Sequence, residues 1–251
     1  MNILHFNTLP STYTYVADNA RSMAHATVVA ADFQTSGRGQ RGNTWEAEAG
    51  KNILATILVR MPSFPAKSQF LISETVSLAI IDAIREHTGL NCLIKWPNDI
   101  YIGNKKLAGI LISHSLAPAA ENGETAISHS VIGFGINVNQ ETFHSDAPNP
   151  VSLTQITGQT YLLTPLLETI ARTIISRLEN LNATSDITSV TEQYLARLWR
   201  NDAAPHPFYD VQTGETFNAR IYAVEPSGHI ILQRWPDGLL ARYAFKEVTW
   251  L

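Results

Sequence analysis

The chain has 251 residues, of which 45% are hydrophobic and 16% are charged, and its formal net charge is −4. A chain of this length can bury a sizeable core, as one large domain or as a large and a small one. The acidic balance argues against a broadly basic nucleic-acid-binding surface, and no apolar run approaches the about 20 residues that span a bilayer. The single cysteine, Cys92, excludes an intrachain disulfide. Together with the lack of a signal peptide, it indicates a reducing cytoplasm.

The N-terminal part of the chain predicts two helices and two strands around a glycine-rich loop. In chain order we expect a helix from Ser11 or Thr12 to about His25, a strand over 27–33, the loop over 34–44, a strand over 52–60 and a helix over 68–87. Ser and Thr are favourable N-capping residues, so Ser68 is the expected cap of the second helix. Gly89 is expected to end that helix, because glycine adopts the left-handed conformation common at helix ends.

The middle of the chain predicts short strands followed by two helices. The strands are expected over 92–95, 100–102, 106–113 and 131–139, with a hairpin turn at Gly103-Asn104, a loop over 117–125, and helices over 164–181 and 189–199. Pro165 suits the first turn of a helix, where no N–H partner is needed. Cys92 lies in the apolar run 90–94, which favours a buried thiol over a reactive one.

The pattern changes after Asp202. Prolines and glycines then separate short strands in which apolar and polar residues alternate, as is typical of a small β-barrel. We therefore predict a boundary near residues 200–206, with a large domain over 1–202 and a small one over 203–251.

The segment 37–42, Gly-Arg-Gly-Gln-Arg-Gly, matches the fingerprint of dinucleotide-binding proteins. That fingerprint requires a helix directly after the loop and an acidic residue about 20 positions on. Neither is found, since the next clear element is a strand and residues 51–73 include no Asp or Glu. The glycines still leave room beside a ligand, and Arg38 and Arg41 can bind phosphate or carboxylate. The alternative is a flexible surface loop with solvated arginines.

A second charged motif lies in an apolar region. It consists of Lys-Trp-Pro-Asn-Asp over 95–99 and Lys-Leu-Ala-Gly over 106–109. Buried charges are costly unless they are paired, so we expect an anionic ligand beside Lys106. For Asp99 the alternative is a turn carboxylate that accepts hydrogen bonds from nearby backbone N–H groups.

Strand alternation adds two expectations. The side chain of Lys106 should share an apolar face with Ala108, Ile110 and Ile112, whereas Lys105 suits an exposed hairpin position. In the strand 131–139 one face is apolar, and the other consists of Gly133, Gly135, Asn137 and Asn139. Glycines in a strand often mark the close approach of another group, here either a ligand ring or a neighbouring helix.

Taken together, these segments resemble the bacterial biotin–protein ligases. The matching pieces occur in that family's order and cover most of the chain. They are Ser11-Thr12 after Leu9-Pro10, the loop 37–42 followed by Trp45, the motifs 95–99 and 106–109, and Gly-Phe-Gly-Ile-Asn over 133–137. Each motif is modest alone, but the ordered set is specific.

The resemblance implies an α+β fold, with a central mixed β-sheet, flanking helices and a C-terminal SH3-like barrel. It implies that biotin and ATP are substrates, with Mg²⁺ carried by the phosphates, and that biotinyl-AMP is transferred to a biotin carboxyl carrier protein or domain. The chain begins directly at the catalytic module, so no DNA partner or repressor activity is expected. A homodimer formed through a sheet edge is a further expectation.

The resemblance also assigns roles to residues. The catalytic candidates are Lys106, Arg38 and Asp99, and no metal ligands are expected. The substrate-binding candidates are Ser11, Thr12, Gln34, Gly37, Gly39, Gln40, Arg41, Trp45, Lys95, Asn98, Gly109, Gly133, Gly135 and Asn137. Within this set, Ser11, Thr12 and Gln34 correspond to the biotin ring end and Asn137 to the adenine side. Thr12 could equally be a helix cap.

Two positions depart from the family pattern. Tyr13 stands where the family often has Asn, and Gln40 stands where many relatives have an Arg that helps to retain the adenylate. We hypothesise that Arg38, Arg41 or Lys106 compensates for the missing charge. A lipoate–protein ligase and a non-catalytic biotin-binding regulator remain the alternative functions.

Overall fold

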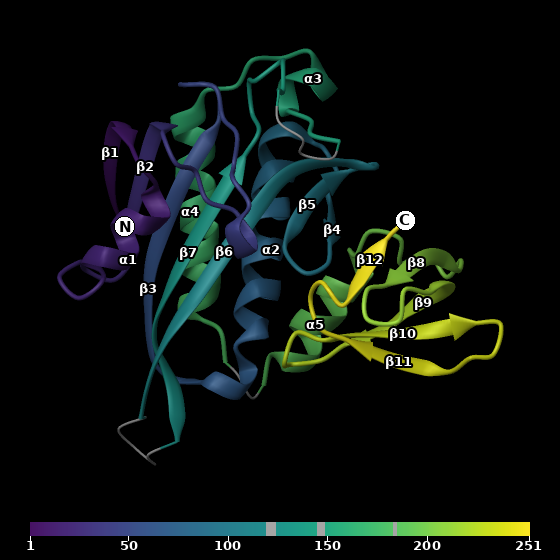
Figure 1. Ribbon diagram of the computed structural model, residues 1–251. Coiled ribbons are helices and arrows are strands. Elements are labelled where there is room, and N and C mark those ends of the chain that lie inside the picture. The colour runs from purple at the N-terminus through teal and green to yellow at the C-terminus, as the bar shows by residue number, and fades with distance from the viewer. Residues whose placement is uncertain (119–123, 145–148, 183–184) are drawn as a thin grey trace.

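The computed structural model describes residues 1–118, 124–144, 149–182 and 185–251, with Arg41 described by its backbone alone (Figure 1). Its larger sheet has seven strands in the order β1-β2-β3-β7-β6-β5-β4. The strands are β1 (Asn2–Leu9), β2 (Thr27–Gln34), β3 (Ile53–Pro65), β4 (Leu93–Lys95), β5 (Asp99–Ile102), β6 (Lys105–Pro118) and β7 (Thr125–Ile136). β1 runs parallel to β2 and the other neighbours are antiparallel. The predicted central mixed sheet is confirmed.

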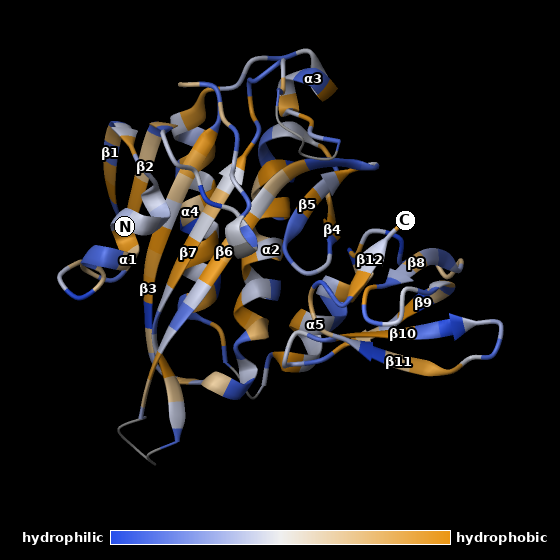
Figure 2. Ribbon diagram, viewed as in Figure 1, coloured by the Kyte–Doolittle hydropathy of each residue, from blue (hydrophilic) through white to orange (hydrophobic). Residues whose placement is uncertain are grey.

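Helices cover both faces of this sheet. α2 (Phe70–Thr88) and α4 (Leu163–Glu179) lie side by side on one face (Figure 1), where they form the main core with inward residues such as Ile57 and Ile132. Apolar residues follow the central strands and α2 (Figure 2). On the other face, α1 (Thr12–Asn19) packs Val16 against Val29 and Leu58. Burial of each such aliphatic side chain contributes about 1.5–3 kcal/mol, so both layers are held mainly by apolar contacts.

The C-terminal part forms a second, antiparallel sheet of five strands in the order β11-β10-β9-β8-β12. Its strands are β8 (His206–Asp210), β9 (Thr216–Val224), β10 (Ile230–Trp235), β11 (Leu240–Tyr243) and β12 (Val248–Trp250). Helix α5 (Ile187–Ala196) precedes it and lies between the two sheets (Figure 1). This arrangement agrees with the predicted small barrel, and the division at residue 202 stays a prediction. None of the helices in the described part is long and apolar enough to cross a bilayer.

Several predicted elements are confirmed. The hairpin at Gly103-Asn104 joins β5 to β6, and α4 carries Pro165 in its first turn. Gly89 ends α2 with φ of 71°, in the left-handed region. Cys92 is buried, and burial raises the pKa of its thiol to about 12, as a plain buried thiol requires.

Other boundaries were wrong. α1 ends at Asn19 rather than near residue 25, because the carbonyl of Asn19 accepts hydrogen bonds from the N–H groups of Ser22 and Met23 in a turn. Ser68 does not cap α2; it lies in the 3-10 helix η2 (Ala66–Ser68), and α2 begins after Gln69. The strand predicted over 131–139 begins at Thr125 and ends at Ile136, so it does not include Asn137.

The sequence analysis missed two elements, β1 and α3, and it began one loop too early, at residue 117. β1 mixes polar and apolar residues without alternation, because it is an edge strand with exposed positions. Helix α3 (Leu153–Thr157) is too short for helical periodicity, although Ser152 and Gln155 form a capping box. The loop predicted over 117–125 is strand up to Pro118, and residues 119–123 lie outside the described part.

Candidate functional site

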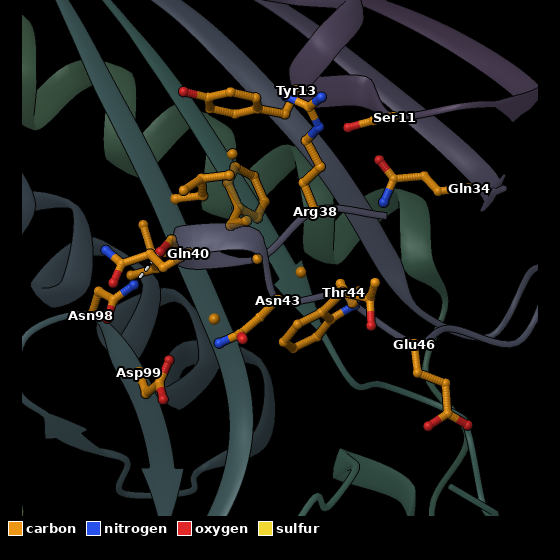
Figure 3. Close-up of a pocket in the computed structure, with 18 of the residues that line it drawn as sticks. Ser11, Tyr13, Gln34, Arg38, Gln40, Asn43, Thr44, Glu46, Asn98 and Asp99 are labelled. Carbon is orange, nitrogen blue, oxygen red and sulfur yellow. Dashed lines mark hydrogen bonds between the residues drawn. The ribbon is translucent and has the colours of Figure 1, made fainter. Parts of the chain in front are cut away.

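A cavity of about 680 Å³ opens on the sheet face that carries α1. This volume is typical of sites for small molecules. Its wall combines α1, the glycine-rich loop and strands of the large sheet (Figure 3). Phe245 from the C-terminal part also lines it. The predicted site residues that line it are Ser11, Thr12, Gln34, Arg38, Gly39, Gln40, Trp45, Asn98, Asp99, Lys106, Gly109, Gly133, Gly135 and Asn137.

The floor of the cavity is a pair of glycines on neighbouring strands. Gly109 of β6 and Gly135 of β7 are direct cross-strand partners, so the sheet presents bare backbone at this point. The indole of Trp45 lies over both, and a Cβ added to Gly109 would meet its Cζ3 at 3.0 Å. Further along β7, a Cβ on Gly133 would meet Tyr13 Cδ2 at 3.0 Å. The close approach predicted for these glycines is therefore made here by two side chains, from the loop and from α1.

The glycine-rich loop forms a narrow turn over this floor. The N–H of Gly39 donates to the carbonyl of Asn43 at 2.7 Å, and the N–H of Trp45 donates to the carbonyl of Gly37 at 3.1 Å. A Cβ on Gly37 would lie 2.6 Å from the carbonyl oxygen of Trp45, so only glycine fits there. The loop continues through the 3-10 helix η1 (Gln40–Gly42). It does not lead into the α-helix that the fingerprint of dinucleotide-binding proteins requires, as expected from the sequence.

One end of the cavity is built from the start of α1. Ser11 is the N-cap of this helix, and its hydroxyl accepts a hydrogen bond from the N–H of Thr14 at 3.4 Å. Thr12 is thus not the cap, and its N–H and hydroxyl donate to Gln34 Oε1 at 2.7 and 3.0 Å. These bonds fix the amide plane of Gln34, so its Nε2 has a defined direction at this end.

The opposite wall carries an ion pair. Lys106 Nζ lies 2.7 Å from Asp99 Oδ1, and the two side chains are 24% and 25% exposed. A partly exposed pair contributes little to stability, and both groups stay accessible to a ligand. Lys106 Nζ also lies 5.8 Å from the centre of the Trp45 ring. Asn98, beside Asp99, donates a hydrogen bond from its amide to the carbonyl of Ile110.

The prediction that the side chain of Lys106 lies on the same strand face as Ala108 was wrong, because β6 contains a bulge. Ile100 pairs with Ala108 and Tyr101 pairs with Lys106, so Leu107 is the extra residue. A bulge of this kind reverses the alternation of the strand. Leu107 and Ala108 are both fully buried, whereas the Lys106 ammonium lies 3.5 Å from the position of a Cβ on Gly109. Lys106 therefore shares the cavity face with Gly109 and not with Ala108.

Two of the predicted residues, Lys95 and Gly37, do not line the cavity. Lys95 points away from the cavity, donating to the Tyr101 hydroxyl at 3.3 Å and lying over the Trp199 ring. Burial, and to a lesser extent the charges of Lys106 and Arg200, lower its pKa, against an opposing effect of Asp99. Gly37 shapes the loop without lining the cavity. The side chain of Arg41 lies outside the described part.

Three buried polar atoms of the cavity residues have no hydrogen-bond partner within the described part of the chain. They are Gln40 Oε1, Trp45 Nε1 and Asn137 Oδ1. A buried polar group without a partner costs about 1–3 kcal/mol, and such groups need an explanation. All three belong to residues that line one cavity, so a ligand with donors and acceptors is the explanation we favour.

Sequence reasoning missed other lining residues. Tyr13 stood out only as a departure from a family pattern, and Glu46 of the loop carried no signal of its own. Phe245 could not be found, because its place depends on how the C-terminal part packs against the turn at Trp96. The described residues contain no cluster of three or more His, Cys, Asp or Glu that could hold a metal ion.

Comparison with known proteins identifies the family. Residues 5–137 match the model of the biotin/lipoate A/B protein ligase family. The chain belongs to this family. It is 31% identical over 164 residues to the bifunctional ligase/repressor BirA of Bacillus subtilis, covering 63% of this chain and 48% of that protein. It is 34% identical over 133 residues to the biotin–[acetyl-CoA-carboxylase] ligase of Mycobacterium tuberculosis, covering 50% of this chain and 44% of that protein.

The chain thus spans about half the length of the curated relatives it matches. Similar solved structures agree on the fold over nearly the whole chain. A biotin protein ligase from Aquifex aeolicus in complex with biotin and ATP has a TM-score of 0.76 at 18% identity, covering 99% of this chain and 97% of that one. A biotin protein ligase from Leishmania major in complex with biotinyl-5-AMP has a TM-score of 0.64 at 20% identity, covering 97% and 98%.

Proposed function

We propose that this protein is an ATP-dependent biotin–protein ligase that activates biotin as biotinyl-5′-AMP and transfers biotin to a lysine of a carrier protein. The observation that carries the proposal is one cavity in which the Lys106–Asp99 pair faces the glycine-rich loop. Such a cavity can hold a carboxylic acid against a nucleotide phosphate. Relatives named as biotin ligases, and similar folds solved with biotin and ATP or with biotinyl-5-AMP, support this use of the fold.

The reaction has two steps. A carboxylate oxygen of biotin attacks the α-phosphorus of ATP, the bond from that phosphorus to the bridging oxygen breaks, and pyrophosphate leaves. The neutral ε-amine of the acceptor lysine then attacks the carbonyl carbon of the mixed anhydride, forming an amide and releasing AMP and a proton. Both nucleophiles belong to the substrates. The protein therefore contributes alignment and charge stabilisation.

Each part of the cavity has a role in this proposal. Lys106 bridges the biotin carboxylate and the α-phosphate, and Arg38 contacts phosphate oxygens. Asp99, which pairs with Lys106 in this structure, orients the incoming lysine once ligands engage the ammonium. Gln34 binds the ring end of biotin, and Asn137 binds the adenine. The glycine-rich loop shields the anhydride from water.

Magnesium is expected to arrive with the nucleotide. It prefers oxygen ligands and commonly binds through one or two carboxylates together with substrate phosphates. The cavity wall offers the carboxylate of Asp99, and one carboxylate together with the phosphates of the nucleotide fits such an ion. It would neutralise phosphate charge there.

The acceptor in this proposal is the biotin carboxyl carrier protein or domain of a biotin-dependent carboxylase. Because the reaction consumes ATP, we infer a cytoplasmic location. We also propose that the protein forms a homodimer through a sheet edge. The molar mass in solution, measured with and without biotin and ATP, tests this proposal.

Pyrophosphate exchange tests the proposed function against its alternatives. Purified protein is incubated with ATP, labelled pyrophosphate and one of biotin, lipoate or octanoate. We expect label to enter ATP only with biotin. Exchange with lipoate would replace the proposal by a lipoate–protein ligase. Biotin binding by calorimetry without exchange would indicate the non-catalytic alternative.

A further inference from the structure

The turn between β4 and β5 brings Asn98 and Asp99 to the cavity, and its position is coupled to β6. The N–H of Ile110 donates to the carbonyl of Asn98 at 3.1 Å, and the amide of Asn98 donates to the carbonyl of Ile110. Asp99 then pairs with Lys106 of β6. A shift of this turn would therefore move the cavity wall that carries the ion pair.

The side chain of Tyr194, which lies outside the cavity, forms a hydrogen bond to this turn. The hydroxyl of Tyr194, on α5, donates to the carbonyl of Pro97 at 2.9 Å. Tyr194 is fully buried, and its ring meets that of Phe70 edge-on at 5.9 Å. Proline has no N–H, so the carbonyl is the one backbone group through which Pro97 can be held by a hydrogen bond.

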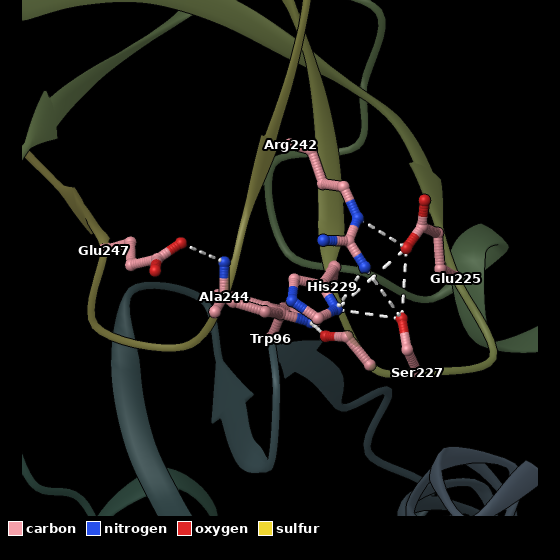
Figure 4. Close-up of polar contacts among 8 residues, drawn as sticks. Trp96, Glu225, Ser227, His229, Arg242, Ala244 and Glu247 are labelled. Atoms are coloured by element: carbon pink, nitrogen blue, oxygen red, sulfur yellow. Dashed lines mark hydrogen bonds and ion pairs between the residues drawn. The ribbon is translucent and has the colours of Figure 1, made fainter. Parts of the chain in front are cut away.

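The residue before Pro97 is held from the C-terminal sheet. Trp96 Nε1 donates to the carbonyl of Gly228 at 3.1 Å. The turn that carries Gly228 packs on Phe70, since a Cβ on Gly228 would lie 2.7 Å from Phe70 Cδ2. Glu225 accepts from Arg242 at 2.8 Å across the base of this turn (Figure 4). Phe70 thus contacts both supports of the turn, Tyr194 and Gly228.

We propose that Tyr194 is a positioning residue for this site: its phenol fixes Pro97, and through Pro97 it sets where Asn98 and Asp99 stand against β6. The inference rests on the proposed function, because it is measured through biotin activation. Tyr194 itself does not line the cavity. It acts through the backbone of the turn.

The test is Tyr194→Phe, which removes the hydroxyl and keeps the ring. We expect kcat of biotin-dependent pyrophosphate exchange to fall about tenfold, with KM for biotin changed less than about twofold. KM should be preserved because Gln34 and Ser11, at the ring end of the cavity, do not contact the turn. The rate is expressed per active site, titrated by the burst of adenylate in a single turnover. A loss of folded protein therefore does not affect it.

Tyr243→Phe is the matched control. Its hydroxyl is also buried and donates to Asp210 Oδ2 at 3.2 Å, within the C-terminal sheet. We expect a comparable loss of stability in urea and an unchanged kcat per active site. If Tyr194→Phe keeps wild-type kcat per active site, or if both variants lose it equally, the positioning role is overturned. Wild-type protein without biotin-dependent exchange would instead contradict the proposed function.

Discussion

The indole of Trp45 rests directly on the backbone of Gly135. A Cβ added to Gly135 would lie 2.4 Å from Cε2 and 2.6 Å from Nε1 of that ring. Carbon and nitrogen atoms do not approach so closely without bonding, so the absence of a side chain at Gly135 sets the height of Trp45 above the sheet. The N–H of Trp45 donates a hydrogen bond to the Gly37 carbonyl. The contact between Trp45 and Gly135 therefore also fixes the position of the loop that bears Arg38.

Gly135→Ala should therefore disturb the cavity by displacing the side chain of Trp45. The methyl group must lift the indole and with it the loop, and we expect the KM for ATP in pyrophosphate exchange to rise about tenfold. A double-mutant cycle isolates the cause. In a Trp45→Ala background the same substitution should add little, because the two residues are in contact. Equal losses in both backgrounds would show that the damage does not pass through Trp45.

The positive side chains of the cavity give the second prediction. Lys106→Ala and Arg38→Ala should each reduce adenylation about tenfold or more, equivalent to about 1.4 kcal/mol of transition-state stabilisation. Lys105→Ala is the control, since Lys105 is the neighbouring lysine, is exposed and does not line the cavity. Near-normal exchange rates in both cavity variants would remove this assignment of the site.

Much of the fold was predictable because its signals are local. Alternation along β7 separates Ile132 and Phe134 from Gly133 and Gly135, and Pro165 marks the first turn of α4. The order of strands in the sheet was not predictable in this way. β1 owes its place to parallel pairing with β2, a contact between segments that no local pattern encodes.

The cavity shows the same division. The motifs that contain Arg38 and Asp99 stand out by their glycines and charges, and both residues line the cavity; their roles were assigned from the family resemblance and stay a prediction. The face of Lys106 was not predictable, because a one-residue bulge at Leu107 leaves no mark on the sequence. Phe245 was missed because it reaches the cavity only when the C-terminal sheet packs against the turn at Trp96.

A buried carboxyl group behind the cavity gives a prediction for stability against pH. Glu74 of α2 is 2% exposed, and burial raises its pKa from 4.5 to about 7, partly opposed by a hydrogen bond from Thr191. The folded protein thus holds this proton more tightly than the unfolded chain does. The contribution of protonated Glu74 to the free energy of unfolding is complete below pH 4.5. It falls as the pH rises towards 7 and stays low above pH 7.

Glu74→Gln removes this titration and keeps an oxygen that can accept from Thr191. At pH 8 the variant should be more stable than the wild type by up to about 3 kcal/mol, and the difference should shrink towards pH 5. Urea denaturation at both pH values measures it. Glu86→Gln, an exposed position on the same helix, should change stability little at either pH. A Glu74→Gln variant that is less stable at pH 8 would contradict the assigned pKa.

The last prediction concerns Gln40, which stands where many bacterial biotin–protein ligases have Arg. Its Oε1 is buried and has no hydrogen-bond partner within the described residues, so the side chain lies in the cavity wall but brings no charge to it. If the protein is the proposed ligase, we expect Arg38, Arg41 or Lys106 to compensate for that missing charge and to retain the adenylate. We expect wild-type protein to release biotinyl-AMP slowly after a single turnover, as measured by rapid gel filtration with labelled biotin. Gln40→Arg should change the release rate less than about threefold, whereas Arg38→Ala should raise it about tenfold. Rapid leakage from the wild type that Gln40→Arg abolishes would show instead that the missing charge at position 40 is not compensated.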